Sequence, residues 1–276
     1  MPRFLCATCG TQYPDTPAPP AACATCADPR QYVNPQGQAW TTPEALARTH
    51  RNGFAEIEPG LLGIGTMPGF AIGQRALLVS TPAGNLLWDC ISLLDAATRR
   101  IVAALGGVAA IAISHPHYYA AMTSWARAFA APVLLHAADR AHVMDPDPAI
   151  RFWEGETLTP LPGLTLIRLG GHFAGGTVLH WAAGAGGAGA LLSGDIVQVG
   201  PDRMVSFMRS YPNLIPLDAG TVRAMAAKLE PRPFEPVYGA WWERVIPVGG
   251  KRAVAESVAR YVAAVSGPPA EPITPP

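Results

Sequence analysis

Charge is scarce in this sequence of 276 residues, and neither sign is in excess. Charged residues make up 14% of the chain, and 20 Lys and Arg residues balance 20 Asp and Glu residues. Proteins whose main partner is a polyanion carry clustered positive charge, so the balance argues against a nucleic acid as partner. It gives equally little reason to expect electrostatic attachment to a membrane surface.

Long hydrophobic runs are also missing, although 49% of the residues are hydrophobic. No window approaches the roughly 20 apolar residues that a membrane-spanning helix needs. The N-terminus, MPRFLCATCG, lacks the apolar segment that follows the basic residue of a secretion signal. We therefore expect a soluble, cytoplasmic protein without a membrane partner. Its length and composition suit one large core with at most a small additional module.

Cysteine is almost absent beyond the first 26 residues. Four of the five cysteines form two pairs, Cys6 with Cys9 and Cys23 with Cys26, each separated by two residues. Two such turns aim four sulfurs at one point, which suits tetrahedral coordination of zinc or iron and resembles zinc ribbons and, less closely, rubredoxins. The alternative, two disulfides, needs an oxidising compartment. Because four thiolates leave no open coordination position, the expected role is structural or in docking a partner.

Hairpin patterns dominate the chain before residue 92, and helices alternate with strands after it. Thr42 and Gly53 mark the expected start and end of a short helix. Further helices are predicted at 93–107, 119–130, 218–231 and 250–265. Strands are predicted at 75–80, 85–92, 108–114, 132–139, 163–171, 176–183, 189–195 and 236–242. This order predicts an α+β protein with two mixed sheets covered by helices, and it disfavours a doubly wound parallel sheet.

The same patterns divide the chain into four regions. Residues 1–40 form the four-cysteine module, and residues 41–55 are expected to be a linker helix. Residues 56–265 hold the main domain. The end of the chain, 266–276, reads SGPPAEPITPP and is predicted to be disordered because it offers little apolar surface to bury.

Two histidines one residue apart follow an apolar strand in the sequence SHPHYYA. Because alternate residues of an extended chain point to the same side, His115 and His117 can bind one metal ion, and Pro116 fixes the backbone between them. Such a pair is equally typical of ordinary surface or core histidines. Two further motifs follow: His172 in the glycine-bracketed GGHFAGG, 55 residues after His117, and Asp195 in LLSGD, another 23 residues on.

The order of these motifs resembles the metallo-β-lactamase superfamily, over roughly residues 60–248. The segment LLWDC, with Asp89, resembles the family's early strand that ends in an aspartate. The resemblance implies an αββα sandwich. It also implies a metal site formed by His115, His117 and His172, with Asp195 in the place of the aspartate that often bridges two metals.

The sequence departs from the family's pattern at the second metal. The aspartate and the last histidine of the family's His-x-His-x-Asp-His motif fall at Tyr119 and Ala120, and a late histidine falls near Ala240 and Trp241. Three ligands of a second ion are therefore missing. We expect one zinc, iron or manganese ion, held by three imidazoles and one carboxylate. At an open position of a zinc ion, water would have its pKa lowered to about 7 and supply a hydroxide nucleophile.

The candidate catalytic residues are Asp195, Tyr118 and Tyr119. Either tyrosine hydroxyl can donate a hydrogen bond to a developing oxyanion, bind the metal or fill the vacant second site. A tyrosine with an ordinary pKa near about 10 is a poor replacement for the motif aspartate as a base.

Other polar and aromatic residues near these motifs have weaker assignments. We expect structural or surface roles for His136 and His142, which lie near Asp139, and Asp89 can orient a ligand histidine. The segment 206–217, together with Trp241 and Trp242, can line an apolar pocket or pack in the core.

Three functions are consistent with these patterns. The leading hypothesis is a mononuclear metallo-hydrolase that acts on a small ester, thioester, lactone or amide through a metal-bound hydroxide. The second is an iron-dependent redox enzyme of the same fold. The third is a catalytically inactive member whose four-cysteine module docks a partner. A true β-lactamase is not expected, because the sequence shows neither an export signal nor the second set of ligands.

Overall fold

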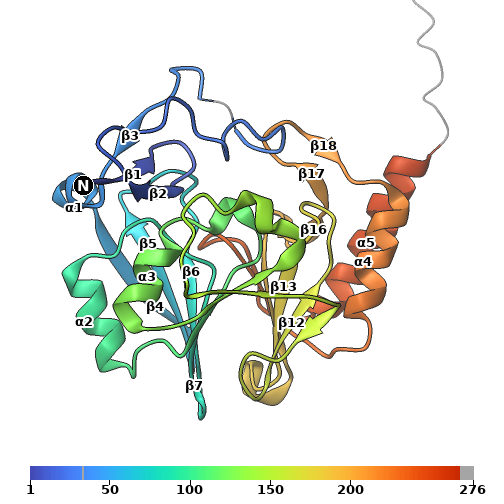
Figure 1. The fold of residues 1–276 in the computed structure, drawn as a ribbon. Helices are drawn as coiled ribbons and strands as arrows, with labels where there is room; N and C mark the ends of the chain where they lie inside the picture. The colour runs from blue at the N-terminus through green and yellow to red at the C-terminus, as the bar shows by residue number, and fades with distance from the viewer. Residues whose placement is uncertain (33, 268–276) are drawn as a thin grey trace, which may run out of the picture.

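The computed structural model describes residues 1–32 and 34–267 as a sandwich of four layers (Figure 1). Two mixed β-sheets stack face to face in the centre. Helices α2 and α3 lie on the left of the first sheet in this view, and α4 and α5 lie on the right of the second. The predicted αββα architecture is confirmed. The tail predicted to be disordered, 266–276, lies outside the described residues from 268 onward.

The first sheet has seven strands, in the order β10-β9-β8-β7-β6-β5-β4. Strands β4 to β7 form an antiparallel meander, and β7 to β10 run parallel. The predicted hairpin is present as β6 and β7. The strand bounds are β4 (Arg51–Glu58), β5 (Leu61–Met67), β6 (Ala76–Thr81), β7 (Gly84–Trp88), β8 (Ala110–Ala112), β9 (Val133–His136) and β10 (Ile150–Trp153).

The second sheet has six strands, in the order β11-β12-β13-β14-β19-β20. Its parallel pair is β14 with β19, and the other neighbours are antiparallel. Its strands are β11 (Thr157–Leu158), β12 (Leu164–Arg168), β13 (Thr177–Trp181), β14 (Ala190–Gly194), β19 (Val237–Gly239) and β20 (Val245–Ile246). Two short ladders follow β14, formed by β15 (Gln198–Val199) with β16 (Val205–Ser206) and by β17 (Met208–Ser210) with β18 (Ile215–Pro216).

The helices begin at side chains that cap them. Thr42, Asp95 and Asp218 each accept a hydrogen bond from the backbone N–H three residues later, which satisfies a donor that the first turn leaves free. The helices are α1 (Pro43–Thr49), α2 (Ala96–Ala104), α3 (Met122–Phe129), α4 (Ala219–Leu229) and α5 (Gly250–Ser266). Short 3₁₀ turns are η1 (Pro116–Tyr118), η2 (Ala137–His142) and η3 (Ala185–Gly187).

The helix predicted to run to Gly53 ends four residues earlier, at Thr49. Gly53 lies inside β4, where it pairs with Gly65 of β5. The glycine was misread as a helix stop because pairing with β5, a contact between distant residues, outweighs the local signal.

Three hydrophobic cores separate the four layers. Alternate residues of β6 divide between two of them: Leu77 and Val79 face the core between the sheets, whereas Leu78 faces the core beneath α2 and α3. Strands buried on both faces read as continuous apolar runs, which explains the sequence RALLVS. The third core lies between the second sheet and the pair α4 and α5, and it includes Val222 and Val254.

The four-cysteine module forms its own small sheet, β2-β1-β3, at the top of Figure 1. Its strands are β1 (Arg3–Cys6), β2 (Gln12–Asp15) and β3 (Trp40–Thr41). The module packs tightly on the main domain. Gly10 has a φ of +81°, and a Cβ at this position would lie 2.4 Å from the hydroxyl of Ser92, which donates a hydrogen bond to the Gly10 carbonyl.

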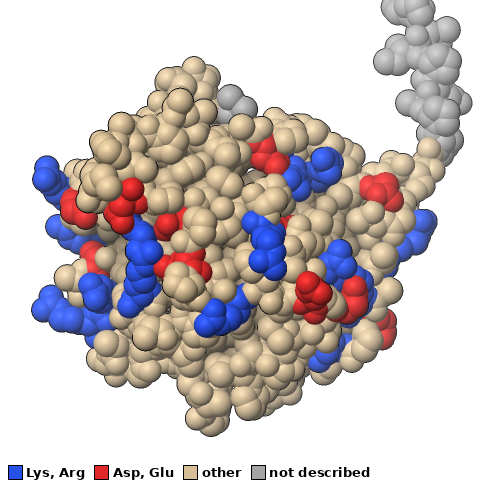
Figure 2. Space-filling model, in the orientation of Figure 1, with Lys and Arg blue, Asp and Glu red and all other residues tan. Residues whose placement is uncertain are grey.

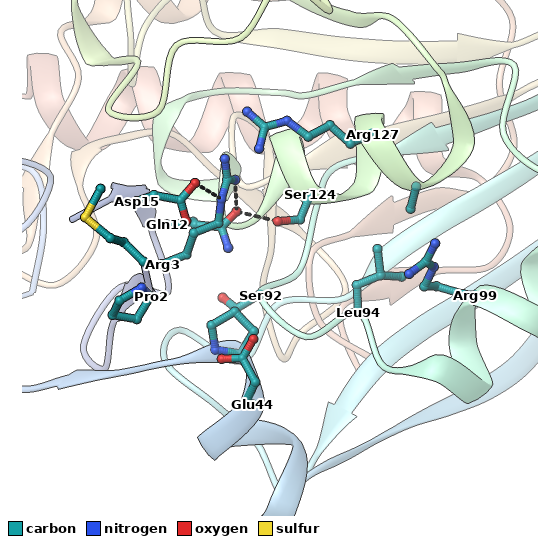
Figure 3. A pocket seen from close by; sticks show the side chains of 13 residues that line it. Pro2, Arg3, Gln12, Asp15, Glu44, Ser92, Leu94, Arg99, Ser124 and Arg127 are labelled. Atoms are coloured by element: carbon teal, nitrogen blue, oxygen red, sulfur yellow. Dashed lines mark hydrogen bonds and ion pairs between the residues drawn. The ribbon is translucent and has the colours of Figure 1, made fainter. Parts of the chain in front are cut away.

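A buried polar network joins the module to α3. In Figure 3, Gln12 lies between Arg3 and Ser124, and its Oε1 accepts hydrogen bonds from Arg3 Nη1 at 3.2 Å and from Ser124 Oγ at 2.7 Å. Arg3 Nη1 also donates to Asp145 Oδ2 at 2.9 Å. The backbone N–H of Gln12 donates to the carbonyl of Ala120. The module is therefore fixed against the loop that carries the histidine pair.

Two surface properties complete the fold. On the face shown in Figure 2, basic and acidic side chains are interspersed and separated by wide uncharged areas. Among the described residues, no helix combines the length and the apolar character that crossing a membrane requires.

Candidate metal centre

The candidate site lies where loops from both sheets meet. The loop after β8 carries His115 and His117, and the turn between β12 and β13 carries His172. Each of these imidazoles offers a nitrogen within 4.8 Å of the other two. Asp195, directly after β14, places its Oδ1 3.2 Å from His115 Nε2. The fold thus gathers four predicted ligands from three separate loops.

The local geometry of the histidine pair differs from the extended chain that the sequence predicts. His115 is extended, with φ −170° and ψ 171°, but Pro116 then begins a 3₁₀ turn that contains His117. Proline favours the first position of such a turn because it has no N–H to satisfy there. The two rings still converge, with centroids 5.1 Å apart.

A glycine brings the two sheets together at the site. Gly194 has a φ of +55°, and a Cβ there would lie 2.7 Å from the hydroxyl of Ser114. Only a residue without a side chain allows this approach, so the Ser-Gly-Asp sequence places Asp195 against the loop of His115. The backbone N–H of Thr177, at the start of β13, donates to the Ser114 carbonyl and also joins the two sheets at this point.

Hydrogen bonds orient the rings. His172 Nδ1 lies 2.8 Å from the carbonyl oxygen of Arg209. Because a carbonyl can only accept, Nδ1 carries the proton and Nε2 is left as the candidate ligand atom. His172 Nε2 faces His117 Nδ1 at 3.3 Å. On the other side of the site, His115 Nδ1 lies 2.9 Å from the Ser114 hydroxyl, which leaves His115 Nε2 directed at Asp195.

Asp89 does not act on a histidine ring as the sequence suggested. Its Oδ1 accepts a hydrogen bond from the backbone N–H of Ser114 at 2.8 Å, so it holds the backbone of the loop and not an imidazole ring. Burial raises the pKa of Asp89 to about 7. The residue has a φ of +59°, which turns the chain sharply after β7.

Asp139 fixes the turn that carries His172. Its Oδ1 accepts from the backbone N–H of Gly175 at 2.8 Å. His136 binds the Gly155 carbonyl through Nε2 at 3.1 Å, and His142 packs on the ring of Phe173. Neither His136 nor His142 belongs to the histidine group.

Burial sets the charge state of the ligands. It lowers the pKa of His115 and of His117 well below the ordinary value, and the neighbouring His172 adds to the effect. Both imidazoles are therefore neutral, as metal binding requires. Burial raises the pKa of Asp195, although His172 opposes this rise.

The two tyrosines of SHPHYYA lie in different surroundings. Tyr118 lines a cavity beside the histidines, and its hydroxyl is buried without a hydrogen-bond partner. Burial and the nearby Asp195 raise its pKa well above the ordinary value, so it is a neutral donor. Tyr119 is not part of the cavity lining and packs in the core beneath α3. The catalytic roles of Tyr118, Tyr119 and Asp195 stay predictions.

The cavity has a volume of about 290 Å³, near the lower end of the range of roughly 300–1,000 Å³ that is usual for small-molecule pockets. His117, His172 and Asp195 line it, together with Tyr211 and Trp241. Trp241 is one of the aromatic residues proposed from sequence as a pocket lining. The neighbouring Trp242 is not in the lining; it packs on Gly63 and Gly65 of β5.

A larger cavity, about 400 Å³, lies at the seam between the module and the main domain (Figure 3). Arg3, Arg99 and Arg127 line it, but none of the candidate metal ligands does. The smaller cavity is therefore the candidate active site.

The four cysteines of the module also converge. Each sulfur lies within 4.8 Å of the others, and the pairs Cys6 with Cys26 and Cys9 with Cys23 are both separated by 3.6 Å. Tetrahedral coordination with metal–sulfur bonds of about 2.3 Å would place the sulfurs about 3.8 Å apart. All four are free cysteines and not disulfides. The arrangement fits a single metal ion.

Groups within the module surround the sulfurs. Gln38 Nε2 donates to Cys6 Sγ at 3.2 Å, and the hydroxyl of Tyr13 donates to Cys23 Sγ at 3.4 Å. Such donors stabilise thiolates, as they do in metal sites where outer groups hold the ligands.

The sequence is 47% identical to the uncharacterized protein YmaE of Bacillus subtilis (strain 168) over 269 residues, which are 96% of this chain and 98% of that protein. The chain belongs to the YmaE family. No protein-family model matches this YmaE relative.

Solved structures establish the fold of this YmaE relative. The metallo-β-lactamase FIM-1 from Pseudomonas aeruginosa, in its mono-zinc form, superimposes with a TM-score of 0.57 and 15% identity, over 79% of this chain and 97% of that one. A metallo-β-lactamase with a HARLDQ motif from Cronobacter sakazakii gives a TM-score of 0.51 and 19% identity, over 77% and 92% of the two chains. The expected metallo-β-lactamase fold is confirmed.

Sequence reasoning missed the part of the module that lines the candidate active site. Thr8, Arg30, Gln31 and Tyr32 contribute to the cavity with His117. No local pattern marks these residues, because their place at the site depends on how the module docks on the main domain.

Proposed function

We propose that this protein is a hydrolase that uses one metal ion to cleave a small ester, thioester, lactone or amide. The metal would be held by the converging imidazoles of His115, His117 and His172, with Asp195 beside them. The proposal rests most directly on four buried atoms that form no hydrogen bond: His117 Nε2, Tyr118 Oη, and the pair His115 Nε2 and Asp195 Oδ1, which face each other at 3.2 Å.

Such atoms are costly to bury. An unsatisfied buried polar group costs about 1–3 kcal/mol, so four at one site point to a ligand that satisfies them. Neutral imidazoles with a carboxylate suit zinc, iron(II) or manganese. A divalent ion there would supply Lewis-acid chemistry, in which it polarises a carbonyl oxygen and makes water more acidic.

The chain's own residues supply the remaining needs of hydrolysis. In this reaction water bonds to the acyl carbon, the bond to the leaving group breaks, and the leaving group departs with a proton. In this proposal the neutral hydroxyl of Tyr118, a residue of the cavity lining, would donate a hydrogen bond to an oxygen that gains negative charge. Trp241 and Tyr211 contribute aromatic surface to the same cavity.

A single metal ion is proposed because the positions expected for a second set of ligands hold other residues. Ala120 is buried, with 3% of its surface exposed, and its carbonyl accepts from the module. Trp241 donates its indole N–H to the carbonyl of Ile72. We further infer zinc or iron in the four-cysteine site, and a cytoplasmic location, because free cysteines in such clusters are typical of reducing compartments.

The test is hydrolysis by purified, metal-loaded protein of 4-nitrophenyl acetate, a thioester, a lactone and an amide. We expect His117→Ala to lower kcat/KM by about a thousandfold or more, because loss of Lewis-acid stabilisation costs several kcal/mol. His50→Ala, at the end of α1 and away from the cavity, is the matched control and is expected to retain wild-type activity. Equal activity in wild type and His117→Ala would refute the hydrolase proposal.

A further inference from the structure

The four-cysteine module contributes directly to the cavity that contains the histidines. Thr8 and the segment 30–32 lie in the lining together with His117, His172 and Asp195. A module with a purely structural metal would need no contact with this cavity. Because these module residues line the same cavity as the candidate ligands, they form one wall of the place where a substrate would bind.

The wall segment is held from both sides. On the module side, the backbone N–H of Asp28 donates to the Thr25 carbonyl, and that of Gln31 donates to the Asp28 carbonyl. On the side of the main domain, Ser210 Oγ donates to the Arg30 carbonyl at 3.0 Å. Ser210 follows Arg209, whose carbonyl orients His172. The wall and one predicted ligand therefore share the same support.

Gln31 presents an unused donor in this wall. Only 4% of its surface is exposed, it is one of the residues that line the cavity, and its Nε2 is buried without a hydrogen-bond partner. Its Oε1 accepts from the backbone N–H of Tyr32 at 2.8 Å, which fixes the orientation of the amide. A fixed, desolvated N–H donor favours an oxygen acceptor on a bound molecule.

The charge next to Gln31 is already neutralised. The guanidinium of Arg30 binds Asp28 through two hydrogen bonds, of 2.6 Å from Nε and 2.5 Å from Nη2, and stacks on the ring of Phe173. Such a fork-to-carboxylate pair leaves little positive charge for an anionic substrate. Ile72 and Trp241 add apolar surface to the same cavity.

We propose that the four-cysteine module forms a substrate subsite, in which Gln31 Nε2 donates a hydrogen bond to a carbonyl oxygen of a small, uncharged acyl compound. The apolar part of this compound would pack on Ile72 and Trp241. The inference rests on the proposed hydrolase function, because it assigns a substrate class to the same cavity. Gln31 is thereby a specificity residue supplied by the module.

Binding to metal-loaded protein tests the subsite without turnover. The probe is N-acetylcysteamine, an uncharged molecule whose thiol can bind a metal and whose amide carbonyl can accept from Gln31. Titration calorimetry would measure its Kd and that of 3-mercaptopropionate, a thiol of similar length with a carboxylate. Wild type is expected to bind the uncharged probe more tightly. Tighter binding of 3-mercaptopropionate would overturn the assignment to uncharged substrates.

Variants at two glutamines of the module isolate the hydrogen bond. Gln31→Met keeps the length of the side chain but removes the donor, and it is expected to weaken N-acetylcysteamine binding and raise KM by about tenfold. Gln31→Glu replaces the donor with an acceptor and should lose at least as much. Gln36→Met makes the same change on the exposed surface of the module and should match wild type. Metal content of each variant would be measured alongside.

The outcomes separate the subsite from the proposed reaction. If wild type hydrolyses none of the substrates but binds N-acetylcysteamine in a manner that depends on Gln31, the subsite stands and the hydrolase proposal fails. If Gln31→Met and Gln31→Glu both retain full metal content, wild-type Kd and wild-type KM, the subsite is refuted whatever the reaction.

Discussion

The protein gathers metal-binding side chains at two places that differ in what surrounds them. In the module, four sulfurs face one another, and neighbouring side chains such as Gln38 and Tyr13 donate to them. In the main domain, three imidazoles converge, and two of them, His117 and His172, line a cavity of about 290 Å³ together with Asp195. Ligand clustering is common to both. The cavity beside the histidines makes that site the candidate for catalysis, whereas the enclosed cysteine site is the candidate for a structural role.

The two sites also differ in how they depend on the fold. The cysteines span 21 residues, from 6 to 26, whereas the ligands of the cavity span 115 to 195. The first site needs only two turns to form. The second needs both sheets stacked in register, with a glycine at 194 to let them approach. The segment 30–32 connects the two sites, so a change at either can affect the other.

The largest effect in this comparison is expected from Cys23→Ser. Loss of one thiolate should empty the module of its metal, and metal binding supplies much of the folding free energy of such small modules. Because module residues line the cavity, loss of the module's structure should displace part of the surface that binds substrate. We expect kcat/KM to fall by about a hundredfold as a result. Elemental analysis and kinetics would measure both changes.

Cys90→Ala provides the matched cysteine control. Cys90 is buried in the core beneath α2 and α3 and is not part of the four-cysteine group. It should retain both metal ions and its catalytic rate. If Cys23→Ser loses the metal of the module but keeps wild-type kinetics, the cavity wall formed by residues 30–32 does not depend on the cysteine site.

Gly175→Ala should weaken the histidine site while leaving the four cysteines unchanged. A Cβ at residue 175 would lie 2.6 Å from Asp139 Oδ2 and 2.9 Å from His136 Cβ, so the turn that carries His172 must shift. Disturbing a group that supports a metal ligand typically lowers the metal affinity by about ten- to a hundredfold. Competition with a chelator would measure this affinity.

Gly69→Ala is the control for added volume, because a Cβ there meets nothing within 4 Å. It should leave the metal affinity unchanged and alter the free energy of unfolding by less than about 0.5 kcal/mol. Equal metal affinities in the two alanine variants would show that the turn tolerates the change and that Asp139 does not position His172.

Much of this architecture could be predicted from sequence, for identifiable physical reasons. The apolar runs, the helix caps and the spacing of the four cysteines are local signals, and each corresponds to an element of the structure. The histidine group was predicted through the resemblance to a family, since no local signal links His115 to His172. The metallo-β-lactamase fold was confirmed by comparison of structures.

The remainder depends on contacts between distant parts of the chain. The predicted end of α1 was wrong because Gly53 belongs to β4, which pairs with β5. The partner predicted for Asp89 was wrong because its carboxylate accepts a hydrogen bond from the backbone N–H of Ser114. Gln31 could not be recognised at all. Its surroundings in the sequence, PRQY, resemble any polar loop, and its place in the cavity lining depends on how the module docks on the main domain.

The smallest effect separates the two adjacent tyrosines. Tyr118→Phe removes the buried hydroxyl of a residue that lines the cavity, and we expect kcat to fall by about tenfold with little change in KM, as for a donor that acts on the transition state. Tyr119→Phe removes a hydroxyl outside the cavity lining and should change kcat by less than about twofold. The reverse ranking would exchange the roles assigned to these residues.

The central claim is that the protein holds one metal ion in a closed cysteine site and one in an open histidine site. The most direct test is the metal content per chain, by element, of protein purified without added metal, for wild type and for a His115→Ala/His117→Ala double variant. Two ions in the wild type and one in the variant are predicted, with the variant retaining the ion of the cysteine site. One ion in both proteins would contradict the account, because the histidine group would then hold no metal.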